Sequence, residues 1–211
     1  MTLSPIEIRI LGCLLEKERL TPENYPLSLN ALTNACNQST NREPVVAYDE
    51  KAVDDALFSL REKKFATVVF GAGSRVQKYR HNLPNLFELT RQETALLTVL
   101  LLRGSQTPGE LRQRTDRLAS FSGGLDEVEK TLEDLAAGSD PLVRVLPPRP
   151  GQKERRYVQL LGGEPDMDAL NAVVFAEIQS TPAQPTRIDR LEAELAALRA
   201  EFEAFKKQFE P

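Results

Sequence analysis

The chain has 211 residues, of which 41% are hydrophobic and 27% are charged, so it can form one large core or two small ones. No apolar run reaches the roughly 18 residues that a membrane-spanning helix needs, and the charged N-terminus is unlike a signal peptide. One histidine and two cysteines leave little material for a metal site or a disulfide scaffold. We therefore expect a soluble, cytoplasmic protein with no cofactor, no metal and no membrane partner.

The acidity of the chain is concentrated near its C-terminal end. Residues 1–86 carry 11 Lys and Arg against 10 Asp and Glu, residues 87–163 carry 11 against 11, and residues 164–211 carry 5 against 10. The net charge of −4 therefore says little about whether residues 1–163 bind an anion such as DNA.

The first 160 residues contain an internal repeat. Leu3-Ser-Pro-Ile-Glu7 aligns with Leu89-Thr-Arg-Gln-Glu93, and Thr21-Pro22 aligns with Thr107-Pro108, both at an offset of 86 residues. The offset then falls to 75, because the first copy is 11 residues longer after its Thr-Pro pair. Two copies of this length favour two similar small domains over a solenoid, which needs at least about three repeats.

Each copy has the pattern of three helices followed by a β-hairpin. Ser4 and Thr90 each precede a glutamate by three residues, which is the capping box of a first helix. The Thr-Pro pairs predict the start of a second helix. Third helices are expected near 49–63 and 125–137, and paired strands near 65–70 with 75–80 and 142–146 with 155–161. This order predicts a mainly α protein with small β-hairpins, an α+β fold of two tandem winged-helix domains over residues 1–86 and 87–163.

The composition changes after residue 163. Residues 164–186 contain three prolines and predict a partly helical linker. Over residues 187–211, apolar side chains recur at alternating spacings of three and four, which is the heptad pattern of a coiled coil. These positions are Ile188, Leu191, Leu195, Leu198, Phe202, Phe205 and Phe209. The flanking charges form attractive pairs in a parallel dimer, so we expect self-association; a trimer or a helix packed on its own chain is the alternative.

Sequence motifs for catalysis are absent. The chain has neither a phosphate-binding Gly-x4-Gly-Lys-Ser/Thr loop nor a Gly-x-Ser-x-Gly nucleophile turn. His81 follows a predicted strand in a polar stretch, where we expect it to be exposed and without a catalytic role. Cys13 and Cys36 lie at helical core spacings, so we expect both to be buried. These observations predict a protein that is not an enzyme and has no catalytic residues.

Basic and amide side chains outside the third helices are the candidates for contact with double-stranded DNA. In a winged-helix domain the third helix enters the major groove and the wing contacts the backbone, but both third helices here are rich in acids, which phosphates repel. The candidate residues are Asn37, Gln38, Asn41, Arg42, Arg75, Lys78, Arg80, Arg112, Arg114, Arg117, Lys153, Arg155 and Arg156. The alternative interpretation is that these side chains belong to ordinary solvated hairpins and helix faces.

Several long blocks resemble the bacterial YceH-like family. They include residues 12–17, 21–38, 41–45 and 106–112. The resemblance covers about residues 3–161 and implies a tandem winged-helix protein of the bacterial cytoplasm without an established activity.

Two functions agree with these patterns. The first is a dimeric, DNA-associated protein similar to transcription regulators, which places its basic wings on phosphates; the fold analogy and the wing charges support it. The second is a non-enzymatic adaptor whose acidic third helices bind a basic protein partner. The third helix of the second copy supports the adaptor, because Lys130 is its only basic residue among five acids.

Overall fold

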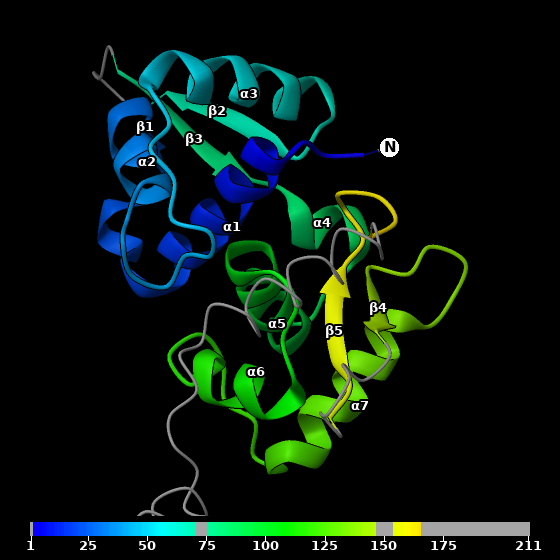
Figure 1. The fold of residues 1–211 in the computed structure, drawn as a ribbon. Coiled ribbons are helices and arrows are strands. Elements are labelled where there is room, and N and C mark those ends of the chain that lie inside the picture. The colour runs from blue at the N-terminus through cyan, green and yellow to red at the C-terminus, as the bar shows by residue number, and fades with distance from the viewer. Residues whose placement is uncertain (1, 71–75, 147–153, 166–211) are drawn as a thin grey trace, which may run out of the picture. The chain divides into compact units, whose positions relative to one another are not determined.

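The computed structural model describes residues 2–70, 76–146 and 154–165 (Figure 1). The chain divides into a unit of residues Met1–Pro165 and a second unit of residues Asp166–Pro211. The linker beyond residue 165 and the coiled-coil positions from Ile188 to Phe209 lie outside the described residues, so their predictions stay predictions. Within the described ranges no helix is long and apolar enough to cross a membrane.

The first copy consists of three helices and a three-stranded antiparallel sheet. Its elements are α1 (Pro5–Leu20), the short 3-10 helix η1 (Pro22–Asn24), β1 (Leu27–Ser28), α2 (Leu29–Cys36), α3 (Glu50–Glu62), β2 (Ala66–Phe70) and β3 (Gln77–His81). The strand order is β1-β3-β2, so β3 is the central strand. Its Tyr79 pairs with Leu27 of β1 on one side and with Val68 of β2 on the other. The predicted hairpin is confirmed, and β1 is an additional strand on its free edge.

The second copy repeats this order without the extra strand. Its elements are α5 (Arg91–Arg103), α6 (Pro108–Thr115), α7 (Gly124–Ala136), β4 (Val143–Leu146) and β5 (Arg156–Gln159), and α4 (Leu83–Phe87) connects the two copies. An isolated bridge from Gln106 to Tyr157 takes the place of β1 at the edge of the β4–β5 hairpin. The fold of the described residues is therefore α+β, with seven α-helices and two small antiparallel sheets.

The helix starts follow the local sequence except at one position. Ser4 and Thr90 both form the predicted capping boxes, and Asp49 caps α3 through the Ala52 N–H. The second helix of the first copy, however, does not begin at Thr21-Pro22. It begins at Leu29, because Pro26 disfavours helix in the residue before it and the Leu27–Ser28 backbone pairs with β3 instead.

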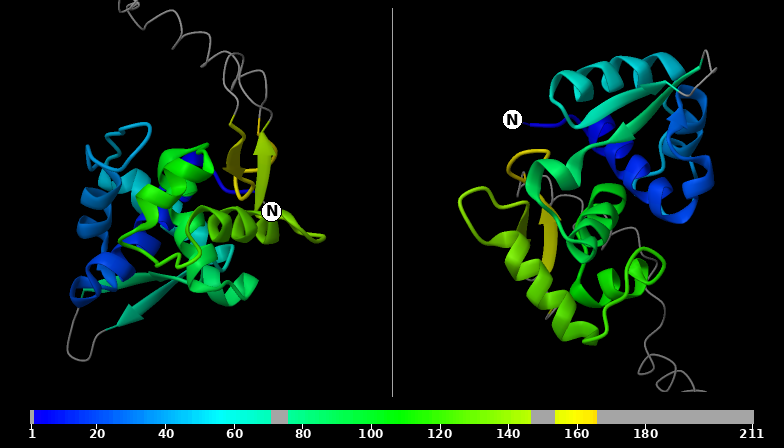
Figure 2. Two further views of the ribbon diagram at one scale, coloured as in Figure 1. Left: turned by 90° about the horizontal axis from the view of Figure 1, so that it is seen from below. Right: turned by 180° about the vertical axis from the view of Figure 1, so that it is seen from behind.

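The first helices of the two copies, α1 and α5, pack against each other. They lie side by side in Figure 1 and in both views of Figure 2, and one continuous core surrounds them. Gly12 permits the close approach, since a Cβ at this position would lie 2.8 Å from Leu102 Cδ2 and 3.2 Å from Leu101 Cβ. The two copies therefore share a core within the unit of residues Met1–Pro165.

Candidate functional site

The amide-rich segment between α2 and α3 is held by internal hydrogen bonds. Asn37 donates from Nδ2 to the Tyr48 carbonyl and accepts the Tyr48 N–H, each at 2.8 Å. Gln38 Oε1 accepts from Lys17 Nζ at 3.3 Å. Asn41, at a φ of 57°, accepts from Arg103 Nη1 at 3.3 Å and connects this segment to the second copy. Both ends of the Asn37 amide are therefore occupied within the protein.

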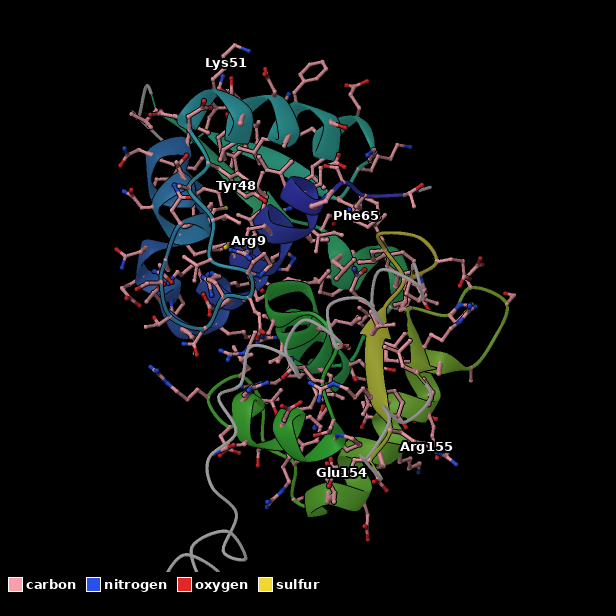
Figure 3. All side chains as sticks on the ribbon, in the orientation of Figure 1. Arg9, Tyr48, Lys51, Phe65, Glu154 and Arg155 are labelled. Atoms are coloured by element: carbon pink, nitrogen blue, oxygen red, sulfur yellow. The ribbon has the colours of Figure 1, made fainter. Side chains whose placement is uncertain are left out.

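Arg42 lies in the interior and is not available to DNA. Its side chain is 0% exposed, and its guanidinium donates to both Glu16 carboxylate oxygens, at 3.0 and 2.6 Å. Further bonds reach the carbonyls of Ala35 and Asn41, each at 3.1 Å. Arg9 is also buried, and its guanidinium donates to the carbonyls of Cys36 and Pro44. Figure 3 shows Arg9 inside the first copy. Arg42 is thus a structural residue, contrary to the sequence-based expectation, because it compensates a buried carboxylate.

The predicted wings present fewer free cations than the sequence suggests. Arg80 on β3 is exposed and Lys78 is half-buried, whereas Arg75 lies outside the described residues. In the second copy Arg155 is exposed at the edge of β5 (Figure 3). Arg156 points inward instead, donating to Glu110 Oε2 and to the Ser105 carbonyl at 2.9 Å each. Lys153 lies outside the described residues.

Of the three arginines on α6 and just after it, two line a cavity and one does not. Arg112 and Arg117 are exposed, and Arg114 is half-buried with its Nη1 3.8 Å from Glu110 Oε1. Arg114 and Arg117 line a cavity of about 260 Å³ together with Asn41 and Arg103. The structure therefore brings together three of the predicted residues, from both copies, and adds Arg103, which is not among the candidates predicted from the sequence.

The third helices expose acidic faces. On α3, Phe58 is 62% exposed and lies one helical turn from Asp54, Asp55 and Glu62. Lys51 projects outward from the same helix, as Figure 3 shows, and its Nζ is 2.9 Å from Asp55 Oδ2. The exposed face of α7 carries four acids and one base, namely Asp126, Glu129, Glu133, Asp134 and Lys130.

The histidine and the two cysteines of the chain are buried. His81 is 8% exposed, contrary to the expectation of an exposed histidine, and its Nε2 lies 2.9 Å from Glu18 Oε2. Burial lowers the pKa of His81, and the nearby Glu18 carboxylate offsets this only in part. Cys13 and Cys36 are both 0% exposed, and the hydrogen bond that the Cys36 thiol donates to Cys13, together with burial, raises the pKa of Cys36.

Glu7 at the start of α1 forms a partly buried ion pair with Lys63 at the end of α3. Burial opposes ionisation of Glu7, but hydrogen bonds from Lys63 and from the Ser4 N–H outweigh it and lower the pKa of the carboxyl. The Lys63 Nζ lies 2.8 Å from the Glu7 carboxylate. Among the described residues no group of His, Cys, Asp and Glu side chains has the arrangement of a metal site.

The chain belongs to the family described as "Protein of unknown function, DUF480", which matches residues 3–152. A UPF0502 protein of Citrifermentans bemidjiense is 51% identical over 195 residues, which cover 92% of this chain and 89% of that protein. A UPF0502 protein of Vibrio parahaemolyticus is 47% identical over 213 residues, covering 99% and 96% of the two chains. A UPF0502 protein of Opitutus terrae is 49% identical over 198 residues, covering 93% and 83%.

Proposed function

We propose that this member of the DUF480 family is a non-enzymatic binding protein of two winged-helix domains, and that the outer face of α3 binds a basic segment of a partner protein. In this proposal residues 1–86 and 87–163 are the two domains, α3 and α7 are their third helices, and the hairpins are their wings. The YceH-like resemblance supports this arrangement. The heptads over residues 187–211 support self-association, and cytoplasmic localisation stays a prediction.

The exposed Phe58 amid carboxylates is the observation that carries the proposal. A large aromatic side chain at the centre of a charged rim is typical of the residues that dominate protein interfaces. Asp54, Asp55 and Glu62 lie around it at helical spacing, and Arg61 is the only base at the same spacing. A DNA backbone would be repelled by this face, whereas a basic peptide with an apolar side chain complements it.

The charges of the chain favour a partner other than its own C-terminal part. Residues 164–211 carry twice as many acids as bases, so they are electrostatically mismatched with α3 and α7. The acid-rich outer face of α7 offers a second surface of the same sign.

The burial of His81, Cys13 and Cys36 supports binding rather than catalysis. These are the only histidine and cysteines of the chain, and each has less than a tenth of its surface exposed. A nucleophile or general base must reach its substrate within hydrogen-bond distance. A binding role places no such demand on these side chains.

A DNA-associated function is the second candidate, and Arg80 is the observation that favours it. Its side chain is exposed on β3, two residues from the half-buried Lys78, in the hairpin position that contacts the phosphate backbone in winged-helix proteins. Arg155 occupies the equivalent hairpin of the second copy. This candidate uses the wings alone and leaves the acidic third helices away from DNA.

Affinity capture with matched baits tests the proposal. Wild type, Phe58→Ser and Phe70→Ser are compared in extracts of the protein's own cells by quantitative mass spectrometry; Phe70, 68% exposed on β2, is the control for removing an exposed aromatic. We expect a basic partner that is lost with Phe58→Ser and retained with Phe70→Ser. That partner, purified, must bind wild type more weakly as salt rises.

Anisotropy of a mixed-sequence duplex of about 30 base pairs separates the two candidates. If the protein is an adaptor, the duplex should not bind even at low salt. A mixed-sequence duplex is sufficient for this test, because attraction to phosphate requires no particular base sequence. Salt-dependent duplex binding that Arg80→Ala weakens, combined with no partner that depends on Phe58, would replace the adaptor with the DNA-associated function.

A further inference from the structure

We propose that the cavity between α1, α5 and α6 is a binding site for a small organic acid, a carboxylate on a compact apolar body. This inference does not depend on the partner of α3. The cavity lies within the unit of residues Met1–Pro165, and both copies of the repeat contribute to it. Its volume is about 260 Å³.

Three arginines give the cavity its positive charge. Arg103 comes from the last turn of α5, Arg114 from the last turn of α6, and Arg117 from the segment that follows α6. Arg117 is exposed and has no carboxylate within ion-pair distance in the described part of the chain. Glu16 is the only acid in the lining, and Arg42 already binds both of its carboxylate oxygens. The site therefore has an excess of positive charge facing the cavity.

Two of these guanidinium groups carry buried N–H donors that lack an acceptor. Within the described residues, neither Arg103 Nε nor Arg114 Nη1 has a hydrogen-bond partner, although each is shielded from solvent. The closest carboxylate to Arg114 Nη1 is that of Glu110, at 3.8 Å, which is too long for a hydrogen bond. Buried donors in native proteins are nearly always satisfied, by protein, by water or by a ligand. A carboxylate in the cavity would lie beside both guanidinium groups and supply the negative charge that the lining lacks.

The remaining lining determines which anions fit. Leu20, Val99, Leu102 and Leu118 contribute apolar surface to the lining, and Asn41 and Gln113 contribute amides. At about 30 Å³ for each water-sized group, the volume holds roughly nine such groups. That is enough for a benzene ring with a carboxylate and too small for a nucleotide. An inorganic oxyanion would leave the leucine and valine surface in contact with water.

Asn41 connects the proposed site to the junction of the two copies. Its Oδ1 accepts from Arg103 Nη1 at 3.3 Å, and its neighbour Glu43 donates its N–H to the Leu102 carbonyl at 2.9 Å. A bound acid would therefore contact groups that hold the α2–α3 segment of the first copy on α5 of the second. Binding should stabilise the folded chain, and the gain in the free energy of unfolding should rise with the logarithm of ligand concentration above Kd.

Titration calorimetry of the full-length protein with benzoate tests this site. Benzyl alcohol, which has a similar shape without the charge, and inorganic phosphate are the comparison ligands. We expect saturable benzoate binding with Kd on the order of 0.1 mM, no binding of benzyl alcohol and weaker binding of phosphate. The thermal midpoint should rise with benzoate concentration and stay constant with benzyl alcohol.

Arginine variants locate the binding. Arg103→Gln and Arg117→Gln should each weaken benzoate by about 10-fold to 100-fold, the usual effect of losing a charge-assisted hydrogen bond. Arg112→Gln is the matched control, because Arg112 is exposed on α6, five residues before Arg117, and does not line the cavity. This variant should bind benzoate like wild type. Arg117 is exposed, so its variant tests the site even if Arg103→Gln fails to fold.

Three results would overturn the proposal. The first is an absence of benzoate binding up to about 10 mM, a concentration about 100 times the expected Kd. The second is phosphate binding as tightly as benzoate, which would mean that the apolar surface contributes nothing. The third is an equal loss of affinity in the Arg112, Arg103 and Arg117 variants, which would indicate general attraction to a basic surface.

Discussion

Replacing Arg42 by methionine tests whether this residue is structural, as its burial indicates, or part of a DNA contact. Methionine is similar in length and fills the space of the aliphatic part of arginine without its charge. The change removes two hydrogen bonds to Glu16 and those to the Ala35 and Asn41 carbonyls. Glu16, whose side chain is 8% exposed, keeps only Lys17, with Nζ 3.6 Å away.

The loss in the free energy of unfolding follows from the buried Glu16 carboxylate, which loses its partner Arg42. Removing one member of a buried ion pair costs about 3–5 kcal/mol, most of which is the penalty of the remaining charge. The whole free energy of unfolding of a protein is typically about 5–15 kcal/mol. We therefore expect Arg42→Met to lose a large fraction of the stability. Arg80→Met, at an exposed position, should change it by less than about 0.5 kcal/mol.

Urea unfolding at pH 7, followed by circular dichroism, measures these free energies. A double-mutant cycle with Glu16→Leu isolates the pair, because the double variant removes both charges. We expect a coupling free energy well above the error of about 0.5 kcal/mol that independent sites show. An Arg42→Met variant as stable as wild type, or single effects that simply add, would refute the structural role.

The remaining predictions concern the core and its ion pairs. Gly12→Val should lower the free energy of unfolding by about 1–3 kcal/mol, because its Cβ would overlap Leu102, and an unchanged thermal midpoint would contradict this packing. The single imidazole, His81, should titrate by NMR below the ordinary value of about 6.5, since burial lowers its pKa; a midpoint above 6.5 would mean that its carboxylate neighbour dominates. Lys63→Met should destabilise the protein more at pH 7 than in acid. The ion pair with Lys63 lowers the pKa of Glu7 in the folded chain, so it contributes stability above the ordinary carboxyl pKa of about 4.3. This contribution is lost as the pH falls through the pKa that Glu7 has in the folded chain. A Lys63→Met effect that is constant from pH 7 to pH 3 would exclude the ion pair as its cause.

Local signals in the sequence predict most helices and both hairpins. Capping boxes depend on residues only three positions apart, so Ser4 and Thr90 identify the starts of α1 and α5 correctly. The strand β1 has no such signal, because two residues form a strand only where a partner strand is already in place. The distant partner of Leu27, Tyr79, cannot be identified from local sequence.

The sequence predicts the buried polar residues least well, although it contains part of the signal. Tyr79 and His81 are two residues apart on β3, so their side chains lie on the same face of the sheet. Burial of the tyrosine therefore indicates burial of the histidine. Glu16 lies three residues from Cys13 on α1, on the same side of the helix. A charge on an apolar helix face requires a buried partner. The sequence could indicate that such a partner exists, but its identity as Arg42 depends on a contact across 26 positions.

The longer connection of the first copy explains why the two copies are not equivalent. Comparison of the two copies locates an additional 11 residues between Thr21-Pro22 and α3, without a role for them. In the structure this segment contacts the second copy through Glu43 on Leu102 and Asn41 on Arg103. Arg42, between these two residues, ties the same segment to α1 through Glu16. The shorter connection of the second copy has no residue equivalent to Asn41. The longer connection supplies Asn41 to the lining of the proposed acid site. A variant with this connection shortened to the length found in the second copy should lose benzoate binding together with the stability that Arg42 provides.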